Sequence, residues 1–287
     1  MTTSNTKLDE PVLTRDDLIL LDDTRFSTET VALVTGGASG IGEATAVALA
    51  ANGMTVVAGD IDTDGLESTV SLAESLDCDG EIIPVTANLT VDNEIDTLID
   101  RADAAGTLRF VANIAGMQHI SPLSSFPMDR YDSLLDVMVR APFMLSKRAL
   151  ELIRSTDDGV GAIGNMSSVH GHYATRDKAA YITAKHGIRG LTRAIAAEGA
   201  GTVRGYSVSV GYVLTPLMVD QIEATADERG ISTQDVIEDV MLGQARTKSL
   251  MTPAEVANLF VFGFSEHASH LNGGDLLFDG GYTTTYD

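Results

Sequence analysis

The stretch Val31-Ala-Leu-Val-Thr-Gly36-Gly-Ala-Ser-Gly40-Ile-Gly42 is the clearest structural signal in this chain. Its first four residues are apolar, with valine at both ends, which predicts a short buried strand. Glycines follow, and then Ile41, Ala44 and Ala48 recur at helical spacing. Glycine lets the backbone turn sharply and approach a ligand, and a helix N-terminus attracts anions. A strand, a glycine loop and a helix in this order predict a phosphate-binding element; the alternative is an ordinary strand-to-helix turn.

Composition sets the class of protein. The chain has 287 residues, 44% of them hydrophobic, which suits one large α/β domain. Asp and Glu number 41 against 19 Lys and Arg, and the formal net charge is −22. The acids are scattered, which indicates a solvated acidic surface like that of proteins from salt-loving organisms, although a merely acidic mesophile protein fits as well. Nucleic acid is excluded as a partner because its phosphates would be repelled.

The sequence lacks the signals of a membrane protein or a secreted protein. No apolar run reaches the roughly 18 residues of a membrane span, and the N-terminus lacks a charged-then-apolar signal sequence. Cys78 is the single cysteine, so an internal disulfide is impossible and we expect a cytoplasmic protein. Residues 1–27 are polar and acidic, and we expect an extension packed loosely on the domain or on a neighbouring subunit. Residues 28–287 then form a single domain.

The second predicted strand, residues 54–60, ends in an acid. Asp60 lies 18 residues after Gly42. A carboxylate there accepts hydrogen bonds from the adenosine ribose hydroxyls of NAD and repels the 2′-phosphate of NADP. No Arg or Lys stands in the glycine loop or just after Asp60 to receive that phosphate. The sequence therefore predicts NAD as the cofactor; the alternative for Asp60 is a solvent-facing acid in a turn.

Strands and helices alternate along the rest of the chain. The further strands are expected at 81–86, 109–113, 161–166, 204–210 and 275–278. The further helical regions are expected at 64–76, 92–105, 128–154, 178–199, 215–247 and 253–263. Alternation with helices of this length implies right-handed crossovers and an α/β fold with a parallel sheet.

Three polar residues form a candidate catalytic group. Tyr181 follows Ser168 by 13 residues, and Lys185 follows Tyr181 by four on a predicted helix, so Tyr181 and Lys185 share one face. The pKa of tyrosine in water is roughly 10, and a nearby ammonium favours the phenolate. The pair is therefore suited to exchange a proton with an alcohol or a carbonyl, and Ser168 to hold the same oxygen. The alternative for Tyr181 and Lys185 is a surface pair.

These motifs together resemble the short-chain dehydrogenase/reductase family. The matching segments are residues 35–42, 113–116, Ser168, residues 181–185, Thr215-Pro216 and residues 279–281. The resemblance covers residues 31–287 and implies a single Rossmann-type doubly wound parallel sheet of about seven strands with helices on both faces. It also implies hydride transfer between a nicotinamide and a carbonyl carbon, without a metal, in a homotetramer.

The resemblance also implies which residues bind the cofactor, with Lys185 holding the nicotinamide ribose hydroxyls. The expected set is Gly36, Ser39, Gly40, Ile41, Gly42, Asp60, Asn88, Leu89, Asn113, Ala115, Gly116, Tyr181, Lys185, Gly211, Val213 and Thr215.

A narrower resemblance is to the D-3-hydroxybutyrate dehydrogenases. It is carried by Gln118-His119, residues 168–171, Lys178, residues 184–187 and residues 215–221. It implies oxidation of (R)-3-hydroxybutyrate to acetoacetate. The residues expected to hold the substrate carboxylate are Gln118, His170, Lys178 and Gln221, and Tyr212 is expected to wall the pocket. A cation and directional donors at these positions suit a small hydroxy acid.

Three positions depart from the family pattern. Met138 replaces an Asn that helps to hold a water linking the catalytic lysine to solvent, and a thioether cannot donate a hydrogen bond. Asn88 stands where an Asp is usual, and Val210-Gly211-Tyr212 replaces Pro-Gly. The alternatives are therefore a dehydrogenase of another small hydroxy acid or secondary alcohol, and, because of Met138, a cofactor-binding pseudoenzyme.

Overall fold

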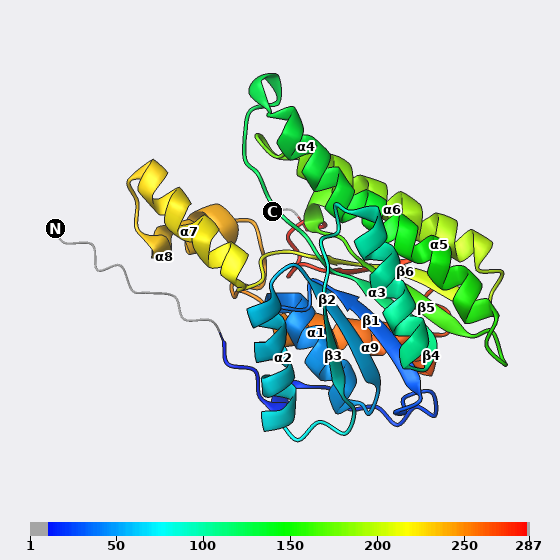
Figure 1. Ribbon diagram of the computed structural model, residues 1–287. Helices are drawn as coiled ribbons and strands as arrows, with labels where there is room; N and C mark the ends of the chain where they lie inside the picture. The colour runs from blue at the N-terminus through cyan, green and yellow to red at the C-terminus, as the bar shows by residue number, and fades with distance from the viewer. Residues whose placement is uncertain (1–10, 286–287) are drawn as a thin grey trace.

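Seven parallel strands form one sheet at the centre of the protein (Figure 1). The computed structural model describes residues 11–285, apart from the side chains at 224, 227 and 228, so the first ten residues of the expected extension lie outside it. The strands are β1 Thr30–Thr35, β2 Thr55–Asp60, β3 Ile82–Thr86, β4 Thr107–Asn113, β5 Gly161–Met166, β6 Val203–Val210 and β7 Asp275–Phe278. Each begins and ends within two residues of its prediction.

The strand order is β3-β2-β1-β4-β5-β6-β7, so the direction of winding reverses between β1 and β4. In open α/β sheets, ligands bind beyond the carboxyl ends of the strands at such a switch point. The expected phosphate-binding loop leaves β1 at that point. The predicted doubly wound sheet is confirmed.

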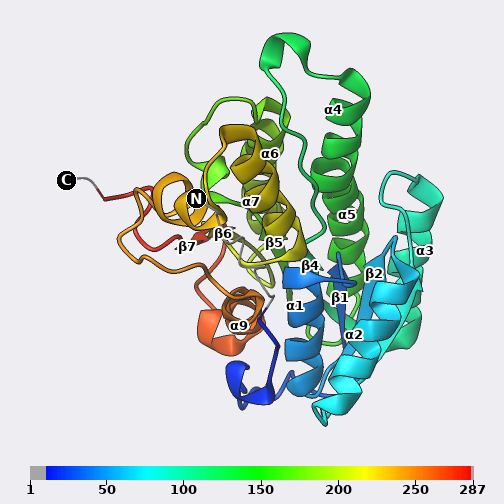
Figure 2. The ribbon, with the colours of Figure 1, turned by 90° about the vertical axis from the view of Figure 1, so that its left-hand side faces the viewer.

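Helices cover both faces of the sheet. The helices are α1 Gly40–Ala51, α2 Thr63–Ser75, α3 Asp92–Ala105, α4 Met128–Leu135, α5 Ala141–Arg154, α6 Ala179–Glu198, α7 Pro216–Arg229, α8 Thr233–Asp235 and α9 Pro253–Phe264. In β1, the alternate residues Ala32 and Val34 pack against the layer of α1 and α9, which lie side by side in Figure 2. Val31 and Leu33 pack against the layer of α3 and α5. This period-two burial on both sides accounts for the continuous apolar run of β1.

The expected helix at 128–154 contains a wide turn. Between α4 and α5, residues Asp136–Arg140 form a π-helical turn, and the N–H of Ala141 donates to the carbonyl of Asp136. Such turns insert an extra residue into a helix and occur frequently at functional sites. Met138 lies in this turn and is buried.

The expected helical region at 215–247 is divided. α7 ends at Arg229 and is followed by Gly230, whose φ of 64° lies in the left-handed region that favours glycine. α8 follows and runs into a second π-helical turn, Val236–Met241. These elements pack on a small apolar cluster of their own, which includes Ile222 and Val236.

The described part of the N-terminal extension is tied to the domain by specific contacts, where loose packing was expected. The guanidinium of Arg15 donates to the carbonyl of Leu76 at 2.9 Å. The carboxamide of Asn258 in α9 donates to the carbonyl of Asp17 at 2.8 Å and accepts from the N–H of Ile19 at 2.9 Å. In the described range, no helix is both long and apolar enough to cross a membrane.

Candidate active site

The glycine loop is folded so tightly that two of its glycines are sterically required. A Cβ at Gly42 would lie 1.8 Å from the carbonyl oxygen of Gly36. Gly36 itself has a φ of +76°, and a Cβ there would lie 2.9 Å from the Cα of Ala115. The loop therefore lies flat between the start of α1 and the segment after β4, which leaves its backbone accessible to a phosphate.

A cavity of about 640 Å³ opens at the carboxyl ends of the strands, above this loop. Fifteen of the sixteen expected cofactor residues line it: Gly36, Ser39, Gly40, Ile41, Gly42, Asp60, Asn88, Leu89, Ala115, Gly116, Tyr181, Lys185, Gly211, Val213 and Thr215. The structure also brings in lining residues that the sequence had not singled out, among them Ile61, Ala87, Thr90, Ser133, Val137 and Met218. The cavity extends from the glycine loop past the carboxylate of Asp60 to Tyr181, and this arrangement suits a dinucleotide.

Asn113 is the exception. It is buried behind the cavity, where its Nδ2 donates to Oδ1 of Asn165 at 2.8 Å, and Asn165 in turn donates to Thr192 of α6 at 2.9 Å. These hydrogen bonds join β4, β5 and α6. In this structure Asn113 therefore supports the elements that carry the site and does not line it.

Asp60 is held in place by two backbone donors. Its Oδ2 accepts from the N–H of Ala38 at 3.2 Å, and its Oδ1 accepts from the N–H of Asp62 at 3.1 Å. The carboxylate therefore forms part of the cavity wall at the end of β2, with lone pairs left to accept further hydrogen bonds. Lys185 is the one lysine or arginine among the described residues that line the cavity.

Ser168, Tyr181 and Lys185 converge at one end of the cavity. Ser168 follows β5 and begins a short 3-10 turn, where its Oγ accepts from the N–H of His170 at 3.2 Å. Tyr181 and Lys185 lie one turn apart on α6, as predicted. The ammonium of Lys185 donates to the carbonyl of Met166 at 2.9 Å and lies 5.3 Å from the centre of the Tyr181 ring.

Burial dominates the acid–base properties of this group. Burial raises the pKa of Tyr181, and its hydrogen bond with Ser168 offsets this only in part. Burial lowers the pKa of Lys185 to about 8. The expectation that the Lys185 charge would lower the pKa of Tyr181 is therefore wrong for this structure, because the low-dielectric surroundings disfavour both charged forms. At neutral pH Tyr181 is a phenol, ready to donate a proton to a carbonyl.

His170 and Lys178 lie beside this group. The His170 ring is edge-on to the Tyr181 ring, with 5.8 Å between the ring centres, and its Nε2 lies 3.1 Å from Oγ1 of Thr175. Burial, together with the charge of Lys178, lowers the pKa of His170 to about 4, so this imidazole is neutral at physiological pH. Lys178 precedes the first turn of α6, and burial lowers its pKa.

The loop after β4 brings Gln118 toward the same region. The N–H of Ser121 donates to the carbonyl of Asp177 at 2.9 Å, which ties this loop to the residue before Lys178. Oε1 of Gln118 is buried and has no hydrogen-bond partner among the described residues. A buried orphan acceptor costs free energy, and it marks a place where a ligand group would be satisfied.

The other two expected substrate residues, Tyr212 and Gln221, make contacts outside this group. Tyr212 is half-buried and edge-on to Tyr282, with 5.8 Å between the ring centres. Gln221 lies on α7, where its carbonyl accepts from the hydroxyl of Thr225. None of the five expected substrate residues, Gln118, His170, Lys178, Tyr212 and Gln221, is among the residues that line the large cavity. The structure adds one residue that the sequence had not singled out, Tyr173, whose ring stacks on His170 at 5.2 Å between centres.

Met138 packs behind Tyr181. It belongs to a small apolar cluster with Leu134, Ala180 and Ala184, against which Tyr181 is packed. Its sulfur lies 3.7 Å from the position of a Cβ built on Gly116. The thioether therefore fills the space between the loop after β4 and α6.

Comparisons with known proteins agree with this geometry. A family described as enoyl-(acyl carrier protein) reductase matches residues 36–283. The chain is 35% identical over 254 residues to a D-beta-hydroxybutyrate dehydrogenase of Rhizobium meliloti, covering 88% of this chain and 98% of the relative. The crystal structure of levodione reductase superposes with a TM-score of 0.83 at 27% identity, covering 91% of this chain and all of that one.

A second solved structure bears on the cofactor. It is a putative NAD(P) dependent gluconate 5-dehydrogenase from Beutenbergia cavernae with bound NADP at low occupancy, with a TM-score of 0.79, 27% identity and coverage of 91% of this chain and 100% of that one. The chain belongs to the short-chain dehydrogenase/reductase family. It is an oxidoreductase of the kind that uses a nicotinamide dinucleotide, and several of its relatives act on different substrates.

Proposed function

We propose that this protein is an NAD-dependent dehydrogenase of a small 3-hydroxy acid, converting (R)-3-hydroxybutyrate to acetoacetate. The observation that carries the proposal is the position of Lys178 and His170 beside Tyr181. Lys178 forms no salt bridge with any described residue, so its charge is available to a ligand. A neutral alcohol would give this half-buried ammonium no counter-charge, whereas a carboxylate would.

Each residue then has a separate part in the reaction. Lys178 pairs with the carboxylate, and the Gln118 carboxamide and neutral His170 fix its orientation by hydrogen bonds. Ser168 donates to the hydroxyl oxygen at C3 while Tyr181 accepts the hydroxyl proton. Bound NAD supplies the hydride acceptor. Because Tyr181 is protonated at neutral pH, oxidation requires it to lose a proton first, and the forward reaction should be measured above pH 8.

The proposal also covers the cofactor preference, the oligomeric state and the cellular location of the protein. We propose NAD over NADP because Asp60 is fixed in the cavity wall. We propose a homotetramer, which is supported by Phe143, an apolar side chain 58% exposed on the outer face of α5. Sedimentation of the purified protein tests this assembly, and a monomer would contradict it. We also propose a cytoplasmic location, supported by the single cysteine.

The direct test is NADH formation with each enantiomer of 3-hydroxybutyrate in high salt. The (R) enantiomer should be oxidised and the (S) enantiomer should not. Oxidation of cyclohexanol or another neutral secondary alcohol, with no activity on either acid, would assign the protein to the alternative class of alcohol dehydrogenases. No turnover of any alcohol, with NAD bound, would favour a cofactor-binding pseudoenzyme.

Replacement of Lys178 tests the carboxylate assignment. Lys178→Ala should lower kcat/KM for the acid about 10- to 100-fold, mainly through KM, because a charge-assisted hydrogen bond contributes roughly 1.5–3 kcal/mol. Lys147→Ala, on the exposed side of α5, is the matched control and should leave kcat/KM unchanged. An unchanged kcat/KM in Lys178→Ala would show that the carboxylate binds elsewhere.

A further inference from the structure

Asp275, the first residue of β7, is the centre of a polar cluster that does not line the large cavity. Its Oδ1 accepts from the hydroxyls of Ser207 and Ser209, which lie two residues apart on β6. Its Oδ2 lies 2.9 Å from Nε2 of His172. A carboxylate can only accept hydrogen bonds, so Nε2 of His172 is the donor. The two serines therefore fix one oxygen of Asp275, and the other oxygen is bonded to His172.

His172 is the last residue of the short turn that Ser168 begins. Within this turn, residues 168–172, the N–H of Gly171 donates to the carbonyl of Ser168 at 2.8 Å, and the N–H of His172 donates to the carbonyl of Val169 at 2.9 Å. The turn also carries His170, whose ring is edge-on to Tyr181. A single 3-10 turn has few hydrogen bonds of poor geometry. Its orientation therefore depends on the contacts that hold its ends.

One set of contacts joins the end of the turn to α6. A Cβ at Gly171 would lie 2.9 Å from the carbonyl oxygen of Lys185 and 2.7 Å from Oγ of Ser167. The guanidinium of Arg189 donates to the carbonyl of Gly171. The turn is therefore packed closely against α6, next to the backbone of Lys185, and it has no room to move further in that direction.

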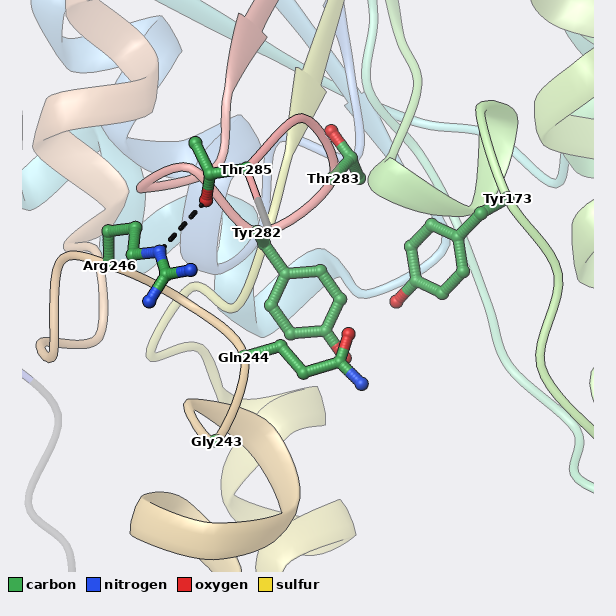
Figure 3. A pocket seen from close by; sticks show the side chains of 7 residues that line it. All are labelled: Tyr173, Gly243, Gln244, Arg246, Tyr282, Thr283 and Thr285. Atoms are coloured by element: carbon green, nitrogen blue, oxygen red, sulfur yellow. Dashed lines mark hydrogen bonds between the residues drawn. The ribbon is translucent and has the colours of Figure 1, made fainter. Parts of the chain in front are cut away.

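The other set of contacts joins the end of the turn to β7 and the segment after it. The side chains of His172 and Asp275 are 21% and 15% exposed, so their charge-assisted hydrogen bond is largely shielded from solvent. The ring of Tyr173 lies 5.6 Å between centres from that of Tyr282. Figure 3 shows these two tyrosines, which come from different segments and line a second cavity of about 360 Å³. Because open space adjoins the tyrosines, the more directional contact on this side is that of His172 with Asp275.

We propose that His172 and Asp275 are positioning residues for the reaction. Their hydrogen bond sets the orientation of the turn, which holds the Ser168 hydroxyl and the His170 ring beside Tyr181. The proposal rests on the proposed function, in which Ser168 and His170 contact the substrate. Without the bond the turn is free to tilt away from α6, and a displacement of about 1 Å at a reacting group costs up to about 100-fold in rate.

Two replacements of His172 separate the hydrogen bond from packing. His172→Leu removes the donor, whereas His172→Gln keeps an N–H donor at about the same reach. His172→Leu should lower kcat/KM for (R)-3-hydroxybutyrate about tenfold or more, through both a lower kcat and a higher KM, because Ser168 and His170 move together. KM for NAD should change less than about twofold, since the glycine loop and Asp60 belong to other segments. His172→Gln should keep kcat/KM within about threefold of the native value.

Three kinetic results would overturn the proposal. They are unchanged kinetics in His172→Leu, equal losses in the leucine and glutamine variants, and a rise in KM for NAD that matches the rise for the acid, which is the sign of a general loss of structure. Tyr206→Phe is the control for stability alone: its hydroxyl donates to the carbonyl of Phe260 at 3.1 Å, so Tm should fall by about 2 °C or more while kcat and both KM values stay unchanged.

Asp275→Asn tests the same bond from the other side and serves where His172→Leu does not fold. The amide oxygen still accepts from the two serines, but the charge that strengthens the bond to His172 is lost. We expect kcat/KM for the acid to fall about threefold or more, with KM for NAD unchanged. Native kinetics in this variant would contradict the proposal.

Hydrogen exchange measures the turn independently of any activity. The N–H groups of His170, Gly171 and His172 all donate within the turn. In His172→Leu these amides should exchange about tenfold faster or more, while those of α1 keep their native rates. Native exchange rates in the turn would overturn the proposal. If the native chain oxidises no 3-hydroxy acid, the proposed function fails, and the exchange rates alone still decide whether His172 holds the turn.

Discussion

We propose that the choice between NAD and NADP depends on Asp60. Its carboxylate is fixed by the backbone of Ala38 and Asp62, so it cannot swing away from a 2′-phosphate placed beside it. We expect a strong preference for NAD. Asp60→Ala combined with Ile61→Arg should reduce the ratio of kcat/KM for NAD to that for NADP at least about tenfold, since the repulsion is removed and a bidentate donor added.

Steady-state kinetics with both cofactors measures this ratio. Asp64→Ala, an exposed acid in the first turn of α2, is the control that should leave the ratio unchanged. Equal efficiency with NAD and NADP in the natural chain would contradict the assignment of Asp60.

At the same scale, the sequence predicted those residues whose role follows from spacing alone. Tyr181 and Lys185 share a face because they lie four residues apart on one helix. Asp60 is the last residue of its strand, whatever position that strand takes in the sheet. The pKa of Tyr181 was not predictable, because its direction depends on how deeply α6 is buried. Tyr173 was missed because its sequence neighbours give no sign of the ring contacts that Tyr282 makes with it from the other end of the chain.

Among the elements, the π-helical turn that carries Met138 packs against Tyr181 of α6. Met138 packs against α6 behind Tyr181, and its thioether cannot donate a hydrogen bond. We expect the enzyme to be active nonetheless, because Ser168, Tyr181 and Lys185 provide most of the transition-state stabilisation. Met138→Asn should change kcat tenfold or less, which corresponds to about 1.4 kcal/mol of barrier or less.

Comparison of the natural chain, Met138→Asn and Met138→Leu separates packing from hydrogen bonding. Leucine keeps an apolar group of similar volume, so it should leave kcat close to that of the natural chain. A natural chain without detectable turnover, made active by asparagine, would establish a degenerate site and support the pseudoenzyme.

Strand positions were predictable because burial on both faces of a parallel sheet requires apolar runs such as Val31–Val34. The π-helical turn at Asp136–Arg140 was not predictable. Its backbone hydrogen bonds are shifted by one residue, but its amino-acid composition is that of an ordinary helix. The break after α7 had a local signal in Gly230, whose left-handed backbone ends the helix. The resemblance to a family supplied the strand count, which the alternation of elements alone left open.

For the whole molecule, the net charge of −22 makes repulsion between surface carboxylates a global destabilising term. We expect Tm to rise by about 5 °C or more between dilute buffer and 1 M salt, where the Debye length falls to about 3 Å. NaCl and KCl should act alike, because the effect is screening. Scanning calorimetry measures it, and a Tm that stays flat or falls would show that the acidic surface is no adaptation to salt.

The contacts of Asn258 affect how the protein unfolds. Its side chain forms hydrogen bonds with the backbone of Asp17 and of Ile19, which lie 241 and 239 residues earlier in the sequence. These hydrogen bonds therefore close a loop that contains the chain from β1 to β6. Release of the N-terminal segment uncovers α9, which packs on α1 beside the glycine loop. Fraying at the start of the chain is thereby coupled to loosening of the layer that supports the cofactor site. The domain should lose its structure in one cooperative step, with no stage at which the terminus is free and the site intact.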